Sequence, residues 1–199
     1  AEKHYRDTIK RFPDNVIART GLAEILKAQN RPDKAEKHYR DTIKRFPDNV
    51  VARNGLGEVL KAQDRLEEAE KHYRDTIERF PRDVVACNGL GEVLKTQNRP
   101  EEAEKQYRAT IERFPDDVVA RTGLAEVLKA QNRPEDAEKQ YRNTIERFPD
   151  NVVARTGLAE VLKAQDRLDE AEKQYRSTVE AFPDDVFARS GLKRSLKAQ

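Results

Sequence analysis

Three histidines and one cysteine are the side chains of this 199-residue chain best suited to metal binding or nucleophilic chemistry. His4, His38 and His72 recur at one fixed spacing along the chain, whereas Cys87 stands alone. A zinc site needs several such ligands within about 2 Å of the metal. Equivalent places on stacked helices lie about 10 Å apart, the width of a helix. The spacing therefore predicts a row of surface histidines, with no metal site and no cofactor.

Neither the cysteine nor the glycine pairs of the chain predict catalysis. Cys87 has no histidine placed beside it as an activating base. Gly55-Leu56-Gly57 resembles the start of a phosphate-binding loop, but it lacks the later glycine and the preceding strand. The apolar positions are filled by Leu, Val, Ala, Tyr and Phe, which cannot supply a nucleophile, a base and an orienting group. We therefore predict that the chain is not an enzyme.

These residues belong to a unit that repeats six times with a period of about 34 residues. Each unit opens with Ala-Glu-Lys-(His/Gln)-Tyr-Arg, beginning at residues 1, 35, 69, 103, 137 and 171. A fixed period of this length is typical of a stacked solenoid, in which each unit buries its apolar face against its neighbours. Such an architecture favours binding or scaffolding over an enclosed active site.

Each unit reads as two antiparallel helices joined by short turns. In the second unit, apolar residues first recur at spacings of three and four from Ala35 to Phe46. Pro47 ends this helix, and Asp48 and Asn49 are good N-caps for the next one, which we expect to reach Gln63. We expect Asp64 to cap the helix that follows, and in three units this turn reads Asn-Arg-Pro, with proline in the first helical turn. The prediction is an all-α fold of about twelve helices.

Composition excludes several kinds of partner. The net charge is +2, from 39 basic and 37 acidic residues, so no strong field attracts nucleic acid or an anionic membrane. No apolar run approaches the roughly 20 residues of a membrane span. A single cysteine suits a reducing compartment, and the first residues already lie inside a repeat rather than in a secretion signal. We therefore expect a cytoplasmic protein with a protein or peptide partner.

The pattern resembles the tetratricopeptide repeat, a family with a helix A and a helix B in a unit of about 34 residues. The positions that carry the resemblance recur in each unit; examples are Leu22 and Ala23 in helix A and Ala35, Tyr39 and Pro47 in helix B. The sequence departs from the family at the early aromatic of helix A, which is arginine in most units (Arg19, Arg53). The resemblance implies a single right-handed α-α superhelix over 1–199, beginning with a helix B and ending with a helix A.

In this family helix A lines a concave surface that holds peptides. Carried onto this chain, the resemblance implies an exposed helix A stripe of one aliphatic, one amide or hydroxyl, one acid and one lysine per unit: Val51, Asn54, Glu58, Lys61; Val85, Asn88, Glu92, Lys95; Val119, Thr122, Glu126 and Lys129. Acid and lysine lie three residues apart and largely neutralise each other. The stripe is therefore either a peptide groove or an ordinary solvated face.

Some family members bind the C-terminal carboxylate of chaperones through lysine and asparagine one helical turn apart. Four residues after Arg19, Arg53 or Arg121 comes alanine or glycine, so we do not expect that activity here.

The two ends of the chain differ. Lys193, Arg194 and Ser195 make the last helix more polar, as in a C-terminal cap, whereas Tyr5, Ile9 and Phe12 leave the first helix apolar. We therefore expect a non-enzymatic scaffold that binds a peptide or protein in the helix A groove. The alternative is a structural or self-assembling array, either a spacer or an end-to-end homodimer through Tyr5, Ile9 and Phe12 of the first helix.

Overall fold

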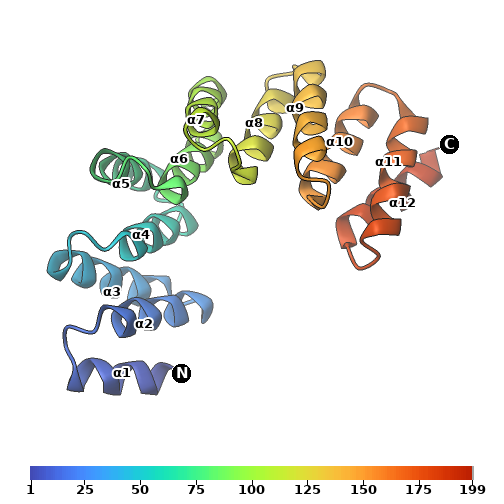
Figure 1. Cartoon of the computed structure of the whole chain (residues 1–199). Helices are drawn as coiled ribbons and strands as arrows, with labels where there is room; N and C mark the ends of the chain where they lie inside the picture. The colour runs from blue at the N-terminus through green and yellow to red at the C-terminus, as the bar shows by residue number, and fades with distance from the viewer. Residues whose placement is uncertain (199) are drawn as a thin grey trace. The chain divides into compact units, whose positions relative to one another are not determined.

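The computed structural model describes residues 1–198, and within them the chain folds into twelve α-helices. The helices fall into two compact units, residues 1–98 and 99–199 (Figure 1). The first contains α1 (Glu2–Arg11), α2 (Val16–Ala28), α3 (Pro32–Arg45), α4 (Val50–Ala62), α5 (Leu66–Arg79) and α6 (Val84–Thr96). The second contains α7 (Pro100–Arg113), α8 (Val118–Ala130), α9 (Pro134–Arg147), α10 (Val152–Ala164), α11 (Leu168–Ala181) and α12 (Val186–Ala198).

The helices alternate between two types, as the repeat predicts. Even-numbered helices have 13 residues and are called helices A; from α3 onward, odd-numbered helices have 14 residues and are called helices B, and α1 is a shorter helix B. Within each unit every helix packs against the next one along the chain, and successive helices A also contact one another. Helices A therefore form a continuous wall in each unit.

Asparagine or aspartate begins each helix A of α2 to α10. Asn49 Oδ1 accepts a hydrogen bond from Ala52 N at 2.7 Å, and Asp117 Oδ1 accepts one from Ala120 N at 2.7 Å. These bonds satisfy an amide that the helix leaves without a partner. The N-cap expected at Asn49 is confirmed.

The turn from helix A to helix B differs from the expectation. Asp64 does not cap α5; it adopts a left-handed conformation with φ of 59° and closes α4 instead. Asp64 N bonds to Lys61 O and Arg65 N bonds to Leu60 O, both at 3.0 Å, which is the Schellman arrangement of a helix C-terminus. Asparagine and aspartate tolerate this conformation better than most residues. The same turn recurs at Asn30, Asn98, Asn132 and Asp166.

A tyrosine from each helix B fills the space beside the glycine of the following helix A. Tyr73 is 1% exposed, and an ideal Cβ on Gly89 would lie 2.4 Å from its Cζ. An ideal Cβ on Gly57 would lie 2.5 Å from the same atom. The recurrent glycine therefore permits the close approach of a tyrosine side chain.

The arginine that departs from the family pattern joins two turns. Arg53 Nε donates to Pro47 O at 2.8 Å, and its guanidinium lies 5.8 Å from the centre of the Phe80 ring. Arg155 repeats both contacts, with Pro149 O at 2.6 Å and Phe182 at 5.8 Å. Arginine therefore replaces an aromatic side chain here by packing against one.

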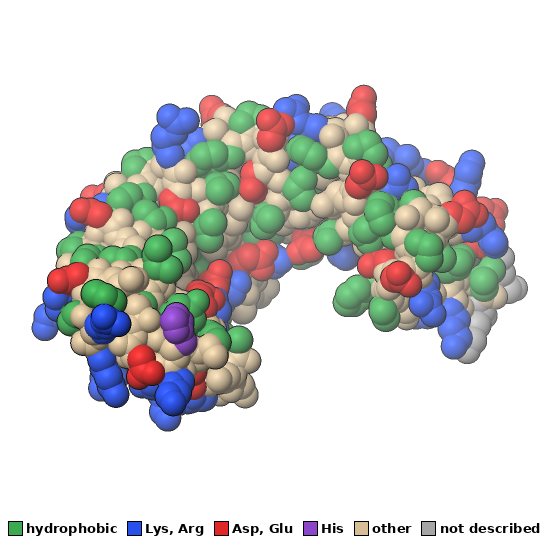
Figure 2. Space-filling view, turned by 60° about the horizontal axis from the view of Figure 1, so that its bottom comes forward, with side chains coloured by type: hydrophobic (Ala, Val, Ile, Leu, Met, Phe, Trp, Pro, Cys, Tyr) green, Lys and Arg blue, Asp and Glu red, His purple; other side chains and the backbone are tan. Residues whose placement is uncertain are grey.

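Ion pairs link each turn to the preceding repeat. Arg65 bonds to Glu36 at 2.7 Å, and Arg167 bonds to Glu138 at 2.6 Å, so the residue before each of these helices B reaches back to the helix B before it. Acidic and basic side chains are interspersed over the visible surface (Figure 2). Ion pairs between side chains that remain in contact with water contribute about 0–1 kcal/mol each, so a single pair adds little to stability.

The histidine row is only partly on the surface. His4 is exposed, but the His72 ring is half-buried against α4, where its Nε2–H can donate to Arg53 O at 2.8 Å. Burial of the His72 ring lowers its pKa from the ordinary 6.5, the positive charges of Arg53 and Arg40 add to this effect, and the Arg53 carbonyl and Asp75 oppose it. Within the described residues, no group of three or more His, Cys, Asp or Glu residues is arranged to hold a metal ion.

We expect His72 to make the stability of the first unit depend on pH. Because its pKa is lower in the folded state, its contribution is complete above pH 6.5 and is lost as the pH falls through the folded-state pKa. His72→Gln should flatten this dependence, since glutamine occupies the same position in α7. Urea unfolding between pH 5 and 7.5 measures it; an unchanged slope in the variant would contradict the assignment.

Candidate functional site

The predicted helix A stripe is exposed only in part. Val51 near the start of α4 is exposed, and Glu58 and Lys61 nearer its end are half-buried. Val85 and Val119 are likewise exposed, Glu92, Lys95 and Glu126 are half-buried, and Lys129 is exposed. The apolar and charged members of the stripe therefore reach the surface.

The amide and hydroxyl members are buried, so the expectation that they are exposed was wrong. Asn54 is 9% exposed, and its Nδ2 donates to Asp83 Oδ2 at 2.8 Å. The hydroxyl of Thr122 donates to the backbone carbonyl of Val118 at 2.9 Å. Asn88 is buried to the same extent as Asn54. These side chains connect helix A to neighbouring backbone and turns, which draws them inward from the groove surface.

Acid and lysine on helix A pair as expected. Lys27 Nζ lies 2.9 Å from Glu24 and 2.6 Å from Glu58 of the next helix A, and Lys95 lies 3.0 Å from Glu92. Partial burial disfavours the charge on Lys27, but the two carboxylates outweigh it and raise the pKa of Lys27. In the first unit the charged part of the stripe is therefore a ladder of ion pairs.

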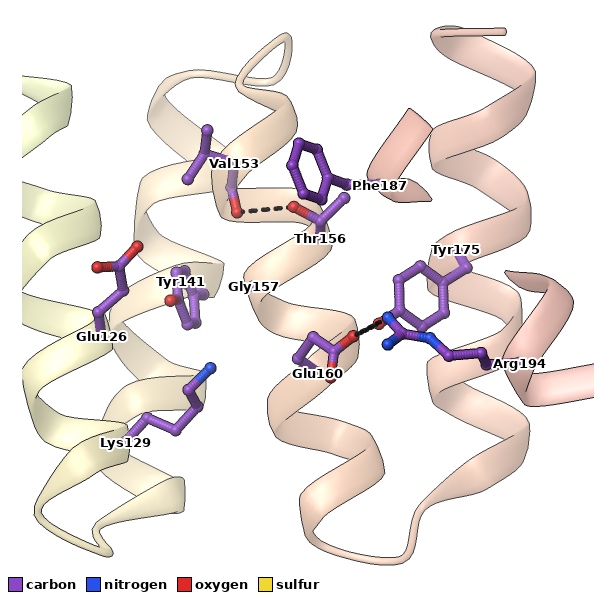
Figure 3. A pocket seen from close by; sticks show the side chains of 10 residues that line it. All are labelled: Glu126, Lys129, Tyr141, Val153, Thr156, Gly157, Glu160, Tyr175, Phe187 and Arg194. Carbon is purple, nitrogen blue, oxygen red and sulfur yellow. Dashed lines mark hydrogen bonds and ion pairs between the residues drawn. The ribbon is translucent and has the colours of Figure 1, made fainter. Parts of the chain in front are cut away.

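The second unit contains a hollow of about 550 Å³ on its helix A side (Figure 3). Helices α8, α10 and α12 contribute most of its walls, and tyrosines of α9 and α11 contribute the remainder. Pockets for small ligands and peptide side chains commonly have volumes of about 300–1,000 Å³. The lining residues are Glu126, Lys129, Tyr141, Val153, Thr156, Gly157, Glu160, Tyr175, Phe187 and Arg194.

The hollow is apolar at one end and charged at the other. Val153 and Phe187 lie in the first turns of α10 and α12, and are 53% and 80% exposed. Seven residues further along these helices are Glu160 and Arg194, which lie 3.2 Å apart (Figure 3). Equivalent positions of the repeat lie side by side on neighbouring helices A. The apolar end of the hollow is therefore formed by the starts of these helices, and the charged end by residues two turns further along.

A tyrosine of helix B stabilises the acid of the charged end. Tyr175 donates its hydroxyl to Glu160 Oε1 at 2.5 Å, and Tyr39 makes the equivalent bond to Glu24. Burial of the Tyr175 hydroxyl, together with the charge of Glu160, raises the pKa of Tyr175 well above its usual range. Tyr175 therefore stays a hydrogen-bond donor to Glu160 throughout the physiological pH range.

Two of the predicted groove residues, Glu126 and Lys129, line this hollow. The sequence did not predict the tyrosines as lining residues, because they fall on the buried face of helix B. Phe187 could have been found as a break in the repeat, and Arg194 was found as one but was assigned to a C-terminal cap. They stand where the other helices A have valine or isoleucine and glutamate, respectively.

The terminal residues singled out from the sequence have mixed environments. Phe12 is exposed, whereas Tyr5 and Ile9 are half-buried on α1. At the other end, Lys193 is exposed and Ser195 is buried, with no hydrogen-bond partner for its Oγ among the described residues. Of the helices described, none has the length and apolar character needed to cross a membrane.

The comparisons with known proteins agree with the helix pairs. One family model described as tetratricopeptide repeat matches residues 1–40, 25–84 and 122–186, and a second with the same description matches residues 60–126 and 94–142. A search among curated proteins gave no match.

Several solved structures have a similar fold. A thermophilic TPR protein of Thermus thermophilus has a TM-score of 0.75 at 20% identity, covering 91% of this chain and 98% of its own. YrrB, a TPR protein with an unusual peptide-binding site, has a TM-score of 0.63 at 18% identity, covering 97% and 100%. Yeast Tom70 has a TM-score of 0.82 at 17% identity over 99% of this chain and 42% of that one. At these identities the likeness concerns the fold alone.

Proposed function

Because the chain belongs to the tetratricopeptide repeat family, whose fold commonly serves as a protein-interaction scaffold, we propose that it is a non-enzymatic scaffold that binds an extended segment of a partner protein along its helices A. The family match covers most of the chain, and YrrB is a structural neighbour with a peptide-binding site. The scaffold positions groups on its helices A for binding.

The hollow of the second unit is the observation that carries this proposal. It combines an exposed apolar pair, Val153 and Phe187, with charged and hydroxyl groups at its other end. Solvent-exposed apolar side chains gathered in a hollow with a polar rim are a common feature of protein-binding sites. An ordinary solvated helix face does not need a phenylalanine that is 80% exposed.

Charge reversal on helices A should remove the partner. We expect the triple variant Glu58→Lys, Glu92→Lys, Glu126→Lys to lose the proteins that the unaltered chain retains from a cell extract, because like charges then line the stripe. Pull-down with quantitative mass spectrometry measures this loss. The matched control reverses Glu67, Glu101 and Glu135, which are exposed on helices B. Equal retention by both triple variants would refute a helix A site.

Self-association is the second candidate, and the environment of α1 favours it. Tyr39, Tyr73 and their equivalents are almost fully buried, whereas Tyr5 is half-buried and Phe12 is 54% exposed. A second α1 could cover this face. Head-to-tail stacking is disfavoured, because Lys193 stands at the register of Gly57, where only glycine or alanine packs beside the next tyrosine.

Light scattering at several concentrations tests this second candidate. A dimer through α1 should appear at high concentration and disappear in the Tyr5→Glu variant, since a charge would then be placed in the apolar interface. A chain that remains monomeric at the highest concentration excludes this mode of assembly, and a dimer that survives Tyr5→Glu places the contact elsewhere.

A further inference from the structure

The hollow of the second unit has more hydrogen-bond donors than it uses. Tyr141 lines it and is 1% exposed, yet its hydroxyl makes no hydrogen bond within the described part of the chain. Tyr39 and Tyr175 instead donate to the glutamate 15 residues earlier. An acceptor supplied by a ligand in the hollow would therefore gain a hydrogen bond from this hydroxyl.

Two cations add to this excess of donors. Lys129 is exposed and forms no ion pair with any residue that the structure describes. Arg194 uses one of its N–H groups on Glu160, in an exposed contact at 3.2 Å. Glu160 also accepts the Tyr175 hydroxyl, so its charge is already held by two donors. Glu126 is the remaining carboxylate of the lining, and it lies on α8, across the hollow from Arg194 (Figure 3).

The distance between the two ends of the hollow determines how far apart the apolar and the charged groups of a ligand must be. Val153 to Glu160 and Phe187 to Arg194 are each seven residues of helix, or about 10 Å. An extended peptide covers this distance in about three residues. Its backbone carbonyls remain free to accept hydrogen bonds, whereas those of an α-helical ligand are already paired.

We propose that the hollow between α8 and α12 binds an extended peptide in which a bulky apolar side chain lies two or three residues from a carboxylate. The apolar side chain contacts Val153 and Phe187, and the carboxylate accepts from the Tyr141 hydroxyl, with the positive charges of Arg194 and Lys129 also lining the hollow. The inference rests on the proposed function, and it specifies which chemical groups the bound peptide carries. The other helices A have Val or Ile in place of Phe187 and Glu in place of Arg194. This difference explains why the proposed peptide would select this end of the chain.

Selection from a library of random dodecapeptides displayed on phage tests the proposal without a known partner. The full chain is the bait, and the Val153→Ser, Phe187→Ser double variant removes peptides that bind elsewhere. Both altered side chains are exposed, so the variant should keep its helical content and melting temperature. We expect the retained peptides to share a bulky apolar residue with Asp, Glu or the terminal carboxylate two or three positions away.

A conservative change then identifies the buried donor. Tyr141→Phe removes only the hydroxyl and should weaken the best peptide by about tenfold or more, as expected for a lost hydrogen bond to a charged group. Tyr73→Phe makes the same change in the first unit, where the hydroxyl of Tyr73 likewise makes no hydrogen bond within the described residues, and should leave affinity unchanged. Replacing the acid of the peptide with its amide should reproduce the Tyr141→Phe loss.

The outcomes separate this inference from the proposed function. Retained peptides without an acid at that spacing, or an affinity that is the same in Tyr141→Phe, would overturn the inference and leave a peptide groove in place. If the selection yields no peptide that binds the unaltered chain but not the double variant, both the inference and the proposed function are overturned for this unit. Peptides with the stated pattern that lose affinity in Tyr141→Phe but not in Tyr73→Phe would support both.

Discussion

Replacing Gly89 with alanine should destabilise the first unit by about 1–2 kcal/mol, although alanine is the better helix former. Glycine in a helix interior costs about 0.5–1 kcal/mol relative to alanine, so a gain would be expected on an open helix face. Here the new methyl would lie 2.4 Å from Cζ of the buried Tyr73 ring. Overpacking of this kind costs about 1–3 kcal/mol or more, which exceeds the gain in helix propensity. Urea unfolding of the full chain measures the difference.

Gly57→Ala is the matched control, because Gly57 touches the same ring. Its ideal Cβ would lie 2.5 Å from Tyr73 Cζ, but the same register is alanine in α2, α8 and α10. The position of Gly89 is glycine in all six repeats. We therefore expect Gly57→Ala to be tolerated within about 0.5 kcal/mol, through a small shift of the ring. Equal costs at the two positions would show that the tyrosine contact does not distinguish them.

Tyr39→Ala should be more severe, with a loss of about 3–5 kcal/mol. The Tyr39 side chain is fully buried between α2 and α4, its ring packs on Gly55, and its hydroxyl donates to Glu24. Truncating a buried aromatic side chain leaves a cavity and removes its transfer free energy, which together cost about this much. The variant also leaves Glu24 without one of its two hydrogen-bond donors.

Tyr5→Ala provides the comparison for that change. Tyr5 occupies the same register but is half-buried, so in a monomer we expect a loss of about 1–2 kcal/mol. Thermal unfolding at low protein concentration measures both variants. If Tyr5→Ala is as costly as Tyr39→Ala, and more so at higher protein concentration, the α1 face is covered by a second chain. If Tyr39→Ala costs less than about 1 kcal/mol, the tyrosine does not hold the repeats together.

The helix pairs could be predicted from the sequence because their signals are local. Apolar spacing of three and four, the proline after each helix B and the asparagine or aspartate N-cap are each contained within a few residues. The turn at Asp64 could not be assigned in the same way. Aspartate is favoured both as an N-cap and in a left-handed helix ending, and the choice depends on backbone bonds that sequence spacing does not show.

The site was less predictable because it depends on contacts between repeats. Asn54 was placed on the surface by its spacing, but its bond to Asp83 of the next turn draws it inward. Tyr141 lies on the buried face of helix B, as its register predicts, but its ring packs on Gly157 and so also reaches the lining of the hollow. Periodicity gives the register of a side chain on one helix. It does not say which atoms of a buried side chain line a groove between helices.

Photo-cross-linking measures most directly whether the helix A groove binds a partner. A benzophenone amino acid replaces Val153 in one variant and Lys139, exposed on α9, in another. The probe is the tightest peptide recovered from the dodecapeptide library with the unaltered chain as bait and no counter-selection. A groove on helices A predicts a covalent adduct at position 153 and none at position 139. An adduct at 139 with none at 153 would contradict the assignment of the binding face.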